Sequence, residues 1–299
     1  MPASLSRKEL MLLGLLTLLW GVNWPIMKAG VQDFAPLTFR TLCMGGGIVL
    51  LAAMARAQGL SLRVERRHWR ELALLGLANM VVWYVLSIWA VKLLSSGRAA
   101  ILGYTMPVWS ALIGLLFYRD RLDARTGLGV LAACAAIGLL LAGELGTLAG
   151  RPAGTLLMLG AAIAWAFGTQ WMRRRTVPGS IVVLSFWMMV MAFACCSAIA
   201  WTAERDQWVR APNAIEWGAI LFNVFGVFGG AQLLWFRLAT ILPPVASGLS
   251  VMLIPVVGLF SGMVLLGERP TWHDWAALGC VLVAIGSVLL PSRGAVREK

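Results

Sequence analysis

The sequence predicts an all-α membrane protein of ten transmembrane helices, arranged as two inverted five-helix repeats around a central cavity. Three observations support this prediction. Hydrophobic residues make up 60% of the 299-residue chain and charged residues only 13%, which is too apolar for a surface that faces water. The chain divides into runs of about 20 apolar residues, the length that crosses a bilayer. A spaced motif also recurs in the two halves of the chain.

The ten predicted membrane helices follow one another with short connections. They span residues 10–28, 35–55, 72–91, 99–118, 125–142, 153–172, 179–202, 215–236, 243–266 and 272–290. The short connections leave little room for an extramembrane domain. The first run lacks a small-x-small cleavage site, so we interpret it as a retained helix and not as a signal peptide.

The recurring motif begins at Pro107-Val108, and its second copy begins 148 residues later at Pro255-Val256. Both copies continue with a glycine, an acidic residue followed by arginine, an Ala-Ile-Gly triplet and a leucine, at identical spacings. The remaining members are Gly114, Asp120-Arg121, Ala136-Ile137-Gly138 and Leu141 in the first copy, and Gly262, Glu268-Arg269, Ala284-Ile285-Gly286 and Leu289 in the second. Chance alignment of apolar runs does not readily preserve such a frame. The sequence therefore predicts two copies of one unit, residues 1–145 and 146–299.

Basic residues outside the predicted helices are distributed unevenly between the two sides of the membrane. With the N-terminus in the cytoplasm, 17 Lys and Arg lie on the cytoplasmic side and 7 on the opposite side. This bias places both termini in the cytoplasm. Because each half has five helices, an odd number, the second half must cross in the opposite sense, which makes the repeat inverted. The net charge of +12 is explained by this distribution, and no continuous basic face indicates a nucleic-acid partner.

The sequence contains no motif that indicates an enzyme or a metal site. It has no nucleophile-base pair, no metal-ligand cluster and no phosphate-binding glycine loop, and His68 and His273 lie at or beyond the membrane surface. The five cysteines lie in apolar runs without paired ligand spacing, so we interpret them as reduced packing residues. We expect no catalytic residue, no cofactor and no metal.

Amide side chains within the apolar runs mark the expected binding site. An amide in hydrocarbon must find a partner or face a wet cavity. The candidates are Asn23, Asn79 and Asn223, and the 148-residue offset places Asn79 within one helical turn of Asn223. We expect helices 1, 3, 4, 6, 8 and 9 to line the cavity, with helices 2, 5, 7 and 10 behind them. The alternative is that these amides form structural hydrogen bonds between neighbouring helices.

Aromatic residues near helix midpoints extend the predicted site. Trp83, Tyr84, Tyr104 and Trp165 lie on helices that are expected to line the cavity. Trp83 follows Asn79 by four residues, so an indole and an amide share one helix face. An aromatic residue at helical spacing can also serve only in packing. Tryptophans near the ends of segments are interpreted as interfacial anchors, namely Trp69, Trp201, Trp208, Trp217, Trp272 and Trp275.

Two prolines are candidate hinges. Pro107 and Pro255 occupy equivalent positions of the repeat, and each removes a helix hydrogen bond at membrane depth. Such breaks also occur in membrane helices that do not move, so the static interpretation stays open. The equivalence of the two positions favours hinges.

The charge pattern constrains a substrate. No Asp or Glu lies in the middle third of a predicted helix, and Arg40 is the only basic candidate within the hydrocarbon. A cationic substrate would lack a counter-charge, whereas the carboxylate and ammonium of a zwitterion can meet amide groups and indole faces. For Arg40 we favour a snorkelling or helix-pairing role. The absence of an intramembrane carboxyl or imidazole favours facilitated movement without proton coupling.

Several segments resemble the ten-helix drug/metabolite transporter superfamily. Residues 19–28, Leu-Trp-Gly-Val-Asn-Trp-Pro-Ile-Met-Lys, resemble its first-helix signature, and residues 159–166, Leu-Gly-Ala-Ala-Ile-Ala-Trp-Ala, resemble the start of its second half. Both Pro-to-acidic-Arg segments resemble the ends of its helices 4 and 9. The abundant Trp and Tyr make the chain most similar to bacterial exporters of aromatic amino acids and related metabolites.

The resemblance implies a carrier of the bacterial inner membrane that works by alternating access. We expect it to export neutral, preferably aromatic, amino acids as a facilitator, with the substrate and the lipid bilayer as its partners. The alternatives are an exporter of other hydrophobic metabolites or drugs, and a channel or scaffold without a carrier cycle. The sequence carries no signal for an oligomeric state.

Overall fold

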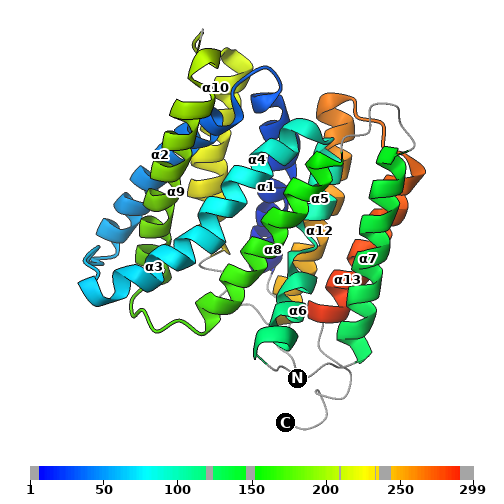
Figure 1. Cartoon of the computed structure of the whole chain (residues 1–299), viewed down its shortest axis with the longest axis horizontal. Coiled ribbons are helices and arrows are strands. Elements are labelled where there is room, and N and C mark those ends of the chain that lie inside the picture. The colour runs from blue at the N-terminus through cyan, green and yellow to red at the C-terminus, as the bar shows by residue number, and fades with distance from the viewer. Residues whose placement is uncertain are drawn as a thin grey trace.

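The computed structural model describes residues 7–118, 124–145, 152–208, 210–232, 234–235 and 244–289. Within these ranges every regular element is helical, and the helices group into ten runs (Figure 1). Eight described runs are long and apolar enough to cross a membrane, with mean hydropathies from 1.3 to 2.2. The chain is therefore a multi-pass membrane protein, and this part of the predicted fold class is confirmed.

The first five runs occupy the positions that the sequence predicts, to within a few residues. They are α1 (Arg7–Val31), α2 (Pro36–Ala57), the composite run η1 (Arg66–His68), α3 (Trp69–Gly76), η2 (Leu77–Val81) and α4 (Val82–Leu93), the pair α5 (Ser96–Gly103) and α6 (Met106–Tyr118), and α7 (Ala124–Leu145). The third and fourth runs differ from simple helices because each changes its helical geometry within the membrane.

The next five runs also lie within a few residues of their predicted positions. They are α8 (Ala153–Arg173), α9 (Ile181–Ala203), α10 (Ala214–Leu221) continued by η4 (Phe222–Ala231), α12 (Pro244–Leu266) and α13 (Trp272–Leu289), with the short turn η3 (Arg205–Gln207) after α9. Polar caps start several of these helices. Asn213 accepts from the Glu216 N–H while the Glu216 carboxylate accepts from the Asn213 N–H, a capping box that begins α10. The Ser180 hydroxyl accepts from the Val182 N–H at the start of α9.

Two segments of π-helix interrupt the third and eighth runs. They are η2 and η4, and each contains one of the predicted amides, Asn79 in η2 and Asn223 in η4. Both amides are buried. A π-helical turn widens the helix and is frequent at functional sites, so the backbone at both amides departs from the regular pattern.

The two candidate hinge prolines lie in different surroundings. Pro107 is the second residue of α6, directly after the break at Tyr104-Thr105 that separates α5 from α6. Pro255 lies inside the continuous helix α12. A proline is well accommodated in the first turn of a helix, where its missing N–H has no partner to lose, whereas inside a helix it removes a hydrogen bond. The hinge role stays a prediction for both.

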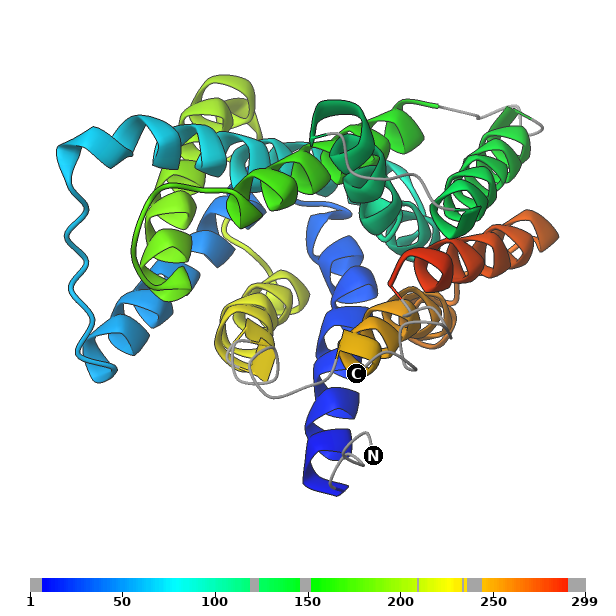
Figure 2. The same ribbon diagram turned by 90° about the horizontal axis from the view of Figure 1, so that it is seen from below.

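The bundle has two ends, named here from their places in Figure 1. At the lower end α1 begins, α2 and α8 end, and α9 begins. At the upper end α1 and α9 end, and α2 and α10 begin. Seen from the lower end in Figure 2, α2 and α9 lie at one side of the molecule and α7 and α13 at the other, while α1 lies near the middle. The main helix contacts follow this layout: α7 with α13, α2 with α9, α1 with α12 and η4, and α8 with α4 and α6.

Candidate functional site

A cavity of about 240 Å³ lies among the helices in the lower half of the bundle. Five elements supply most of its described wall, namely α2, η2 with α4, α8, α9 and η4. The wall reaches the lower end at Arg173 and Ile181, which are both exposed. Its deepest described members include Tyr84 and Phe228, whose rings meet edge to face with centroids 6.3 Å apart. The cavity therefore extends from the lower end to about the middle of the bundle.

Aromatic rings form much of this wall, and each is supported by another ring. Trp165 of α8 lines the cavity, and the Trp83 ring packs behind it with centroids 5.2 Å apart. Trp235 also lines the cavity and packs on Trp20 of α1 at 5.6 Å. Paired aromatic rings stabilise each other beyond the burial of their area, by about 0.5–1.5 kcal/mol. The wall is thus both apolar and rigidly held.

Asn79 supplies the central polar group of the wall. It is buried and lines the cavity, and its amide forms no hydrogen bond to another described residue. Gly168 of α8 makes room for it, because a Cβ at position 168 would lie 2.7 Å from the Asn79 Cβ. The other polar lining side chains are Thr169, Arg173, Ser185 and Gln232. No Asp, Glu or His is among the described residues of the wall.

Three of the seven predicted site residues line the cavity directly: Asn79, Tyr84 and Trp165. Trp83 lies one layer behind, in contact with Trp165. Tyr104 is buried elsewhere and packs edge to face on Trp24, with ring centroids 6.2 Å apart. The roles of all these residues stay predictions.

The amides Asn23 and Asn223 lie outside the described cavity wall. Asn223 donates to the Ala219 carbonyl at 3.0 Å, within its own helix. The side-chain oxygens of both Asn23 and Asn223 are buried without a hydrogen-bond donor. A buried acceptor without a donor costs about 1–3 kcal/mol. Neither oxygen forms the hydrogen bond between helices that would explain these amides as purely structural.

The helices that line the cavity differ from those that we expected. Helix α9, the seventh run, contributes four residues, Ile181, Ser185, Met188 and Met189, and α2 contributes Leu51. We expected both runs to lie behind the wall. Polar and aromatic residues in the sequence did not indicate these two helices, because most of the side chains that they contribute are aliphatic or methionine. A methionine-rich stretch is nevertheless typical of adaptable binding surfaces, and it was the one available signal.

Buried and half-buried carboxylates close the upper end. Both oxygens of Glu268, which follows α12, accept hydrogen bonds at the start of α5, from the Ser96 N–H at 2.7 Å and the Ser96 hydroxyl at 2.8 Å. Both oxygens of Glu204, which follows α9, accept at the start of α2, from the Leu37 N–H at 2.9 Å and the Thr38 N–H at 2.8 Å. A carboxylate is stabilised at a helix N-terminus by the free N–H groups and the helix dipole. Each carboxylate therefore ties a helix of the second half to a helix of the first.

Cationic side chains complete the upper end. Arg98 Nε donates to Asp274 Oδ1 at 2.5 Å, and Arg210 donates to both oxygens of Glu216 at 2.6 Å. The hydrogen bonds that Arg210 donates to the Glu216 carboxylate raise the pKa of Arg210 above its ordinary value. Lys28 of α1 donates to the Lys92 carbonyl at 2.7 Å, which ties α1 to the end of α4. The upper end is therefore held shut by contacts of charged groups, which join the end of α12 to α5, the end of α9 to α2, α5 to α13 and α1 to α4.

Arg40 does not snorkel to the surface; it contacts the neighbouring helix α1, as the helix-pairing alternative of the favoured role expects. Its side chain is 3% exposed, with Nη2 3.0 Å from the Met27 sulfur and Nε without a partner. Its guanidinium carbon lies 5.1 Å from the centroid of the Tyr84 ring, which lines the cavity. Arg40 thus places a positive charge behind the deepest part of the wall.

A bundle of ten helical runs that encloses a small cavity, open toward one end and shut at the other, is the architecture of a membrane transporter. The sequence profile of the EamA-like transporter family matches residues 7–142 and 152–290. The chain belongs to this family, which is part of the drug/metabolite transporter superfamily.

Relatives in several bacteria cover nearly the whole chain. The uncharacterized transporter YoaV of Bacillus subtilis is 24% identical over 90% of this chain and 92% of its own length. The uncharacterized inner membrane transporter YedA of Escherichia coli is 26% identical over 94% of this chain and 92% of its own. A probable amino-acid metabolite efflux pump of Salmonella typhimurium is 26% identical over 94% of both chains. A protein of known crystal structure, 20% identical, shares the fold with a TM-score of 0.66 over 95% of this chain and 99% of its own.

Proposed function

We propose that the protein exports neutral, preferably aromatic, amino acids across the bacterial inner membrane by alternating access. The observation that carries this proposal is the cavity wall, in which the rings of Tyr84 and Trp165 flank the open amide of Asn79. An aromatic side chain finds stacking partners there, and an amide can bind either charged group of a zwitterion. The wall offers no described carboxylate to a cation.

The size of the cavity favours a small metabolite. Pockets for drug-sized ligands measure roughly 300–1,000 Å³, whereas this cavity measures about 240 Å³. A single amino acid suits the smaller space. The relative from Salmonella typhimurium, a probable amino-acid metabolite efflux pump, supports the same substrate class at 26% identity. The second candidate, export of larger hydrophobic compounds, would require the cavity to widen.

Alternating access would use two halves, residues 1–145 and 146–299, related as an inverted repeat. Two observations support this arrangement. The 148-residue offset maps η2 onto residues 225–229, which lie inside the other π-helical segment, η4. The helix contacts also form corresponding pairs, because α1 with α12 matches α8 with α6, and α2 with η4 matches α9 with η2. The family profile matches once in each half.

The orientation follows from the 17-to-7 bias of basic residues, which assigns the lower end to the cytoplasm. The shut upper end then faces outward, and the cavity is accessible from inside the cell. This is the state in which an exporter accepts its substrate. The name of YedA, an inner membrane transporter, supports the same membrane for this chain. Reporter fusions after Arg175 and after Arg210 should report cytoplasm and periplasm, respectively, and the reverse result would invert the proposed direction.

The test of function uses purified protein in proteoliposomes. We expect saturable uptake of radiolabelled tryptophan or phenylalanine and counterflow against an internal pool of the same amino acid, with little uptake of lysine or glutamate. Uptake without saturation or counterflow would indicate a channel. Failure of every neutral amino acid to compete, with competition by a larger hydrophobic compound, would favour the second candidate.

The energy source is tested in the same vesicles. We propose a facilitator because the described wall of the cavity contains no carboxyl or imidazole group that could exchange a proton at physiological pH. A pH gradient without a substrate gradient should then cause no net accumulation. Sustained uphill accumulation driven by the pH gradient would contradict the facilitator and direct attention to the carboxylates of the upper end.

A further inference from the structure

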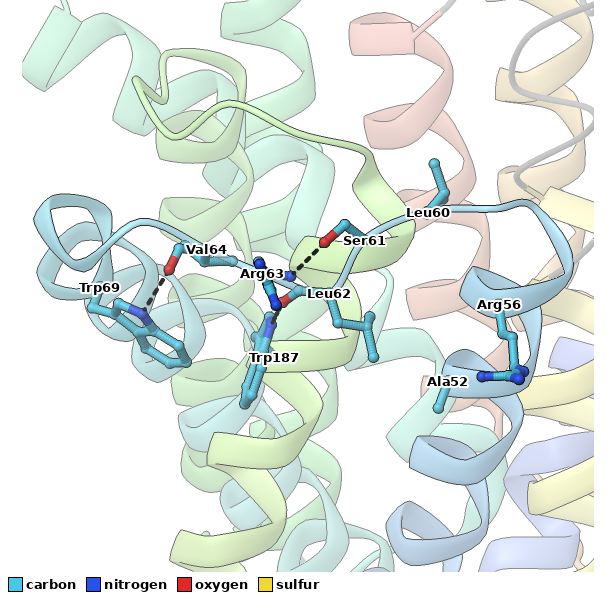
Figure 3. A pocket seen from close by; sticks show the side chains of 9 residues that line it. All are labelled: Ala52, Arg56, Leu60, Ser61, Leu62, Arg63, Val64, Trp69 and Trp187. Carbon is cyan, nitrogen blue, oxygen red and sulfur yellow. Dashed lines mark hydrogen bonds between the residues drawn. The ribbon is translucent and has the colours of Figure 1, made fainter.

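A second hollow lies at the edge of the molecule, away from the central cavity. It measures about 790 Å³ and is formed by the end of α2, the connection from Leu60 to Val64, the start of α3 and one side of α9 (Figure 3). We refer to it as the edge groove. Figure 2 shows that the connection between α2 and α3 runs along the outer margin of the bundle at the lower end. The edge groove therefore lies at the periphery of the bundle, between this connection and α9.

Two tryptophans hold the connection in place. Trp187 of α9 donates its indole N–H to the Leu62 carbonyl at 2.7 Å, and Trp69 of α3 donates to the Val64 carbonyl at 3.2 Å. Their rings meet edge to face with centroids 4.8 Å apart. Leu62 and Val64 are half-buried and pack against the core, whereas Ser61 and Arg63 between them are exposed. The groove is therefore preformed, with an apolar and aromatic wall.

Two arginines lie in this groove without a described partner. Arg56, in the last turn of α2, and Arg63, in the connection, both line it and are exposed. Neither guanidinium forms an ion pair or a side-chain hydrogen bond with another described residue. The nearby carboxylate of Glu65 is already paired with Arg67 at 2.8 Å. The groove thus combines two free positive charges with an apolar wall, and its described lining contains no acidic residue.

The position of the groove relates these features to the membrane surface. Tryptophan side chains prefer the interface between hydrocarbon and water, and Arg56 lies one residue from the end of α2. Basic pockets at this depth attract the anionic headgroups of lipids, since each Lys or Arg near the surface contributes to the attraction. An occupant must present an anion to the arginines and hydrocarbon to Leu62, Val64 and the indole rings. A phospholipid of the adjacent leaflet has both parts.

We propose that the edge groove binds an anionic phospholipid, with its phosphate between Arg56 and Arg63 and an acyl chain along the apolar wall. A zwitterionic phospholipid carries a cation beside its phosphate, which the two guanidinium groups repel. Arginine suits phosphate better than lysine because its planar guanidinium donates two parallel hydrogen bonds. The proposal does not depend on the transported substrate or on the direction of transport.

The test compares lipids of the two charge types. The purified full-length protein is exposed to mixed micelles that contain phosphatidylglycerol or phosphatidylcholine, and the lipid retained per protein is measured by native mass spectrometry. We expect the wild-type protein to retain phosphatidylglycerol at least tenfold more strongly than phosphatidylcholine. Equal retention of the two lipids would overturn the proposal. Loss of retained phosphatidylglycerol to millimolar inorganic phosphate would overturn it too, because the site would then recognise phosphate alone.

Matched variants locate the binding. Arg56→Gln combined with Arg63→Gln should reduce retention of phosphatidylglycerol at least tenfold. Arg66→Gln combined with Arg70→Gln removes the same charge from η1 and the first turn of α3, directly after the connection, but leaves the lining residues of the groove intact. This control pair should change retention less than threefold. Equal losses in the two double variants would overturn the proposal in favour of a diffuse charge effect.

Folding is controlled with the unfolding temperature in phosphatidylcholine micelles, which should match that of the wild type in both double variants. If the Gln pair does not fold, Arg56→Lys with Arg63→Lys keeps both charges and removes the paired guanidinium contacts. Retention of phosphatidylglycerol should then fall by a smaller factor than in the Gln pair, about threefold. It should still decrease as the salt concentration rises, because both positive charges remain. Two results together would overturn the proposal. The Lys pair would retain as much phosphatidylglycerol as the wild type, and retention by the wild type would not change with salt concentration.

Discussion

The upper and lower ends of the bundle use their charged residues in opposite ways. At the upper end the carboxylates of Glu204, Glu216 and Asp274 are buried and fully bonded. At the lower end the Arg67–Glu65 pair is 73% and 63% exposed, and the cavity opens between exposed side chains. Breaking the buried contacts leaves charges without partners, whereas exposed pairs exchange readily with water. The buried and bonded carboxylates therefore make the upper end the more stable closure, and the exposed pair gives the lower end no such closure.

The repeat offers a reason for this asymmetry. At the upper end Glu268 binds the N–H groups and the hydroxyl at the start of α5. The offset of 148 residues places Pro244 and Val245 of α12 at the positions of Ser96 and Gly97. Proline has neither an N–H nor a hydroxyl. The start of α12 therefore has fewer hydrogen-bond donors for a carboxylate than the start of α5. The corresponding carboxylate, Asp120, lies outside the described residues.

The largest expected effect comes from weakening two carboxylate contacts that join the halves at the upper end, those of Glu204 and Glu268. In Glu204→Gln combined with Glu268→Gln, each change weakens hydrogen bonds to a charged group that contribute about 1.5–3 kcal/mol. The upper end should open, and the buried thiol of Cys43 on α2 should become reactive toward a membrane-impermeant maleimide. The readout is the labelled fraction of Cys43 after peptide mass spectrometry. Glu65→Gln at the lower end is the control, and equal labelling of Cys43 in both variants would contradict the closure.

A steric change should weaken the same contact without altering charge. A Cβ at Gly262 would lie 2.4 Å from the Ser96 hydroxyl oxygen and 2.5 Å from Glu268 Oε2. Gly262→Ala should therefore lower the free energy of unfolding by about 1–3 kcal/mol, the usual cost of overpacking. Gly279→Ala on α13 is the control, because a Cβ there meets nothing within 4 Å. Thermal unfolding compares the two variants. If Gly262→Ala were as stable as the control, the contact between Ser96 and Glu268 would not contribute to stability as expected.

Substitutions in the cavity should act on affinity more than on stability. Trp165→Ala and Asn79→Ala each remove a lining group and should raise the Kd for the transported amino acid about tenfold, equivalent to about 1.4 kcal/mol. Tyr104→Ala should raise it less, because Tyr104 packs on Trp24 outside the described wall. Equilibrium binding measures all three. Trp201→Ala, whose side chain is 61% exposed at the upper end, is the control. An equal Kd in the control and in Trp165→Ala would remove the cavity from the binding site.

The smallest effect is expected in a comparison of one ion pair from each end. The Arg98–Asp274 pair is 17% and 5% exposed. Arg98→Gln should therefore lower the free energy of unfolding by about 1.5–3 kcal/mol, the contribution of a hydrogen bond to a charged group. The exposed Arg67–Glu65 pair should contribute about 0–1 kcal/mol, and Arg67→Gln should be nearly neutral. Denaturant unfolding in the same detergent measures both. If Arg67→Gln lowered the free energy of unfolding more than Arg98→Gln, the ion pair of the lower end would be the more stabilising one, which would contradict the comparison.

Part of the cavity wall was predictable because buried amides and aromatic residues stand out in an apolar sequence. Asn79, Tyr84 and Trp165 were identified in this way, and all three line the cavity. Ser185 and Met188 were not identified, although they line the same cavity, because a serine or methionine within a helix has no distinctive local signal. Arg40 is buried, but its neighbours Met27 and Tyr84 could not be inferred from its position in the chain.

The sequence by itself determined the ten helices and their approximate bounds, because the thickness of a bilayer imposes a length on each apolar run. It also contained the repeat that relates Pro107 to Pro255. Only the tertiary structure decided which end of the bundle is shut, since Glu268 meets Ser96 across 172 residues and Glu204 meets Leu37 across 167. A carboxylate after a helix is an ordinary feature of a sequence. Its effect depends on which other helix starts beside it, and helix packing alone decides that.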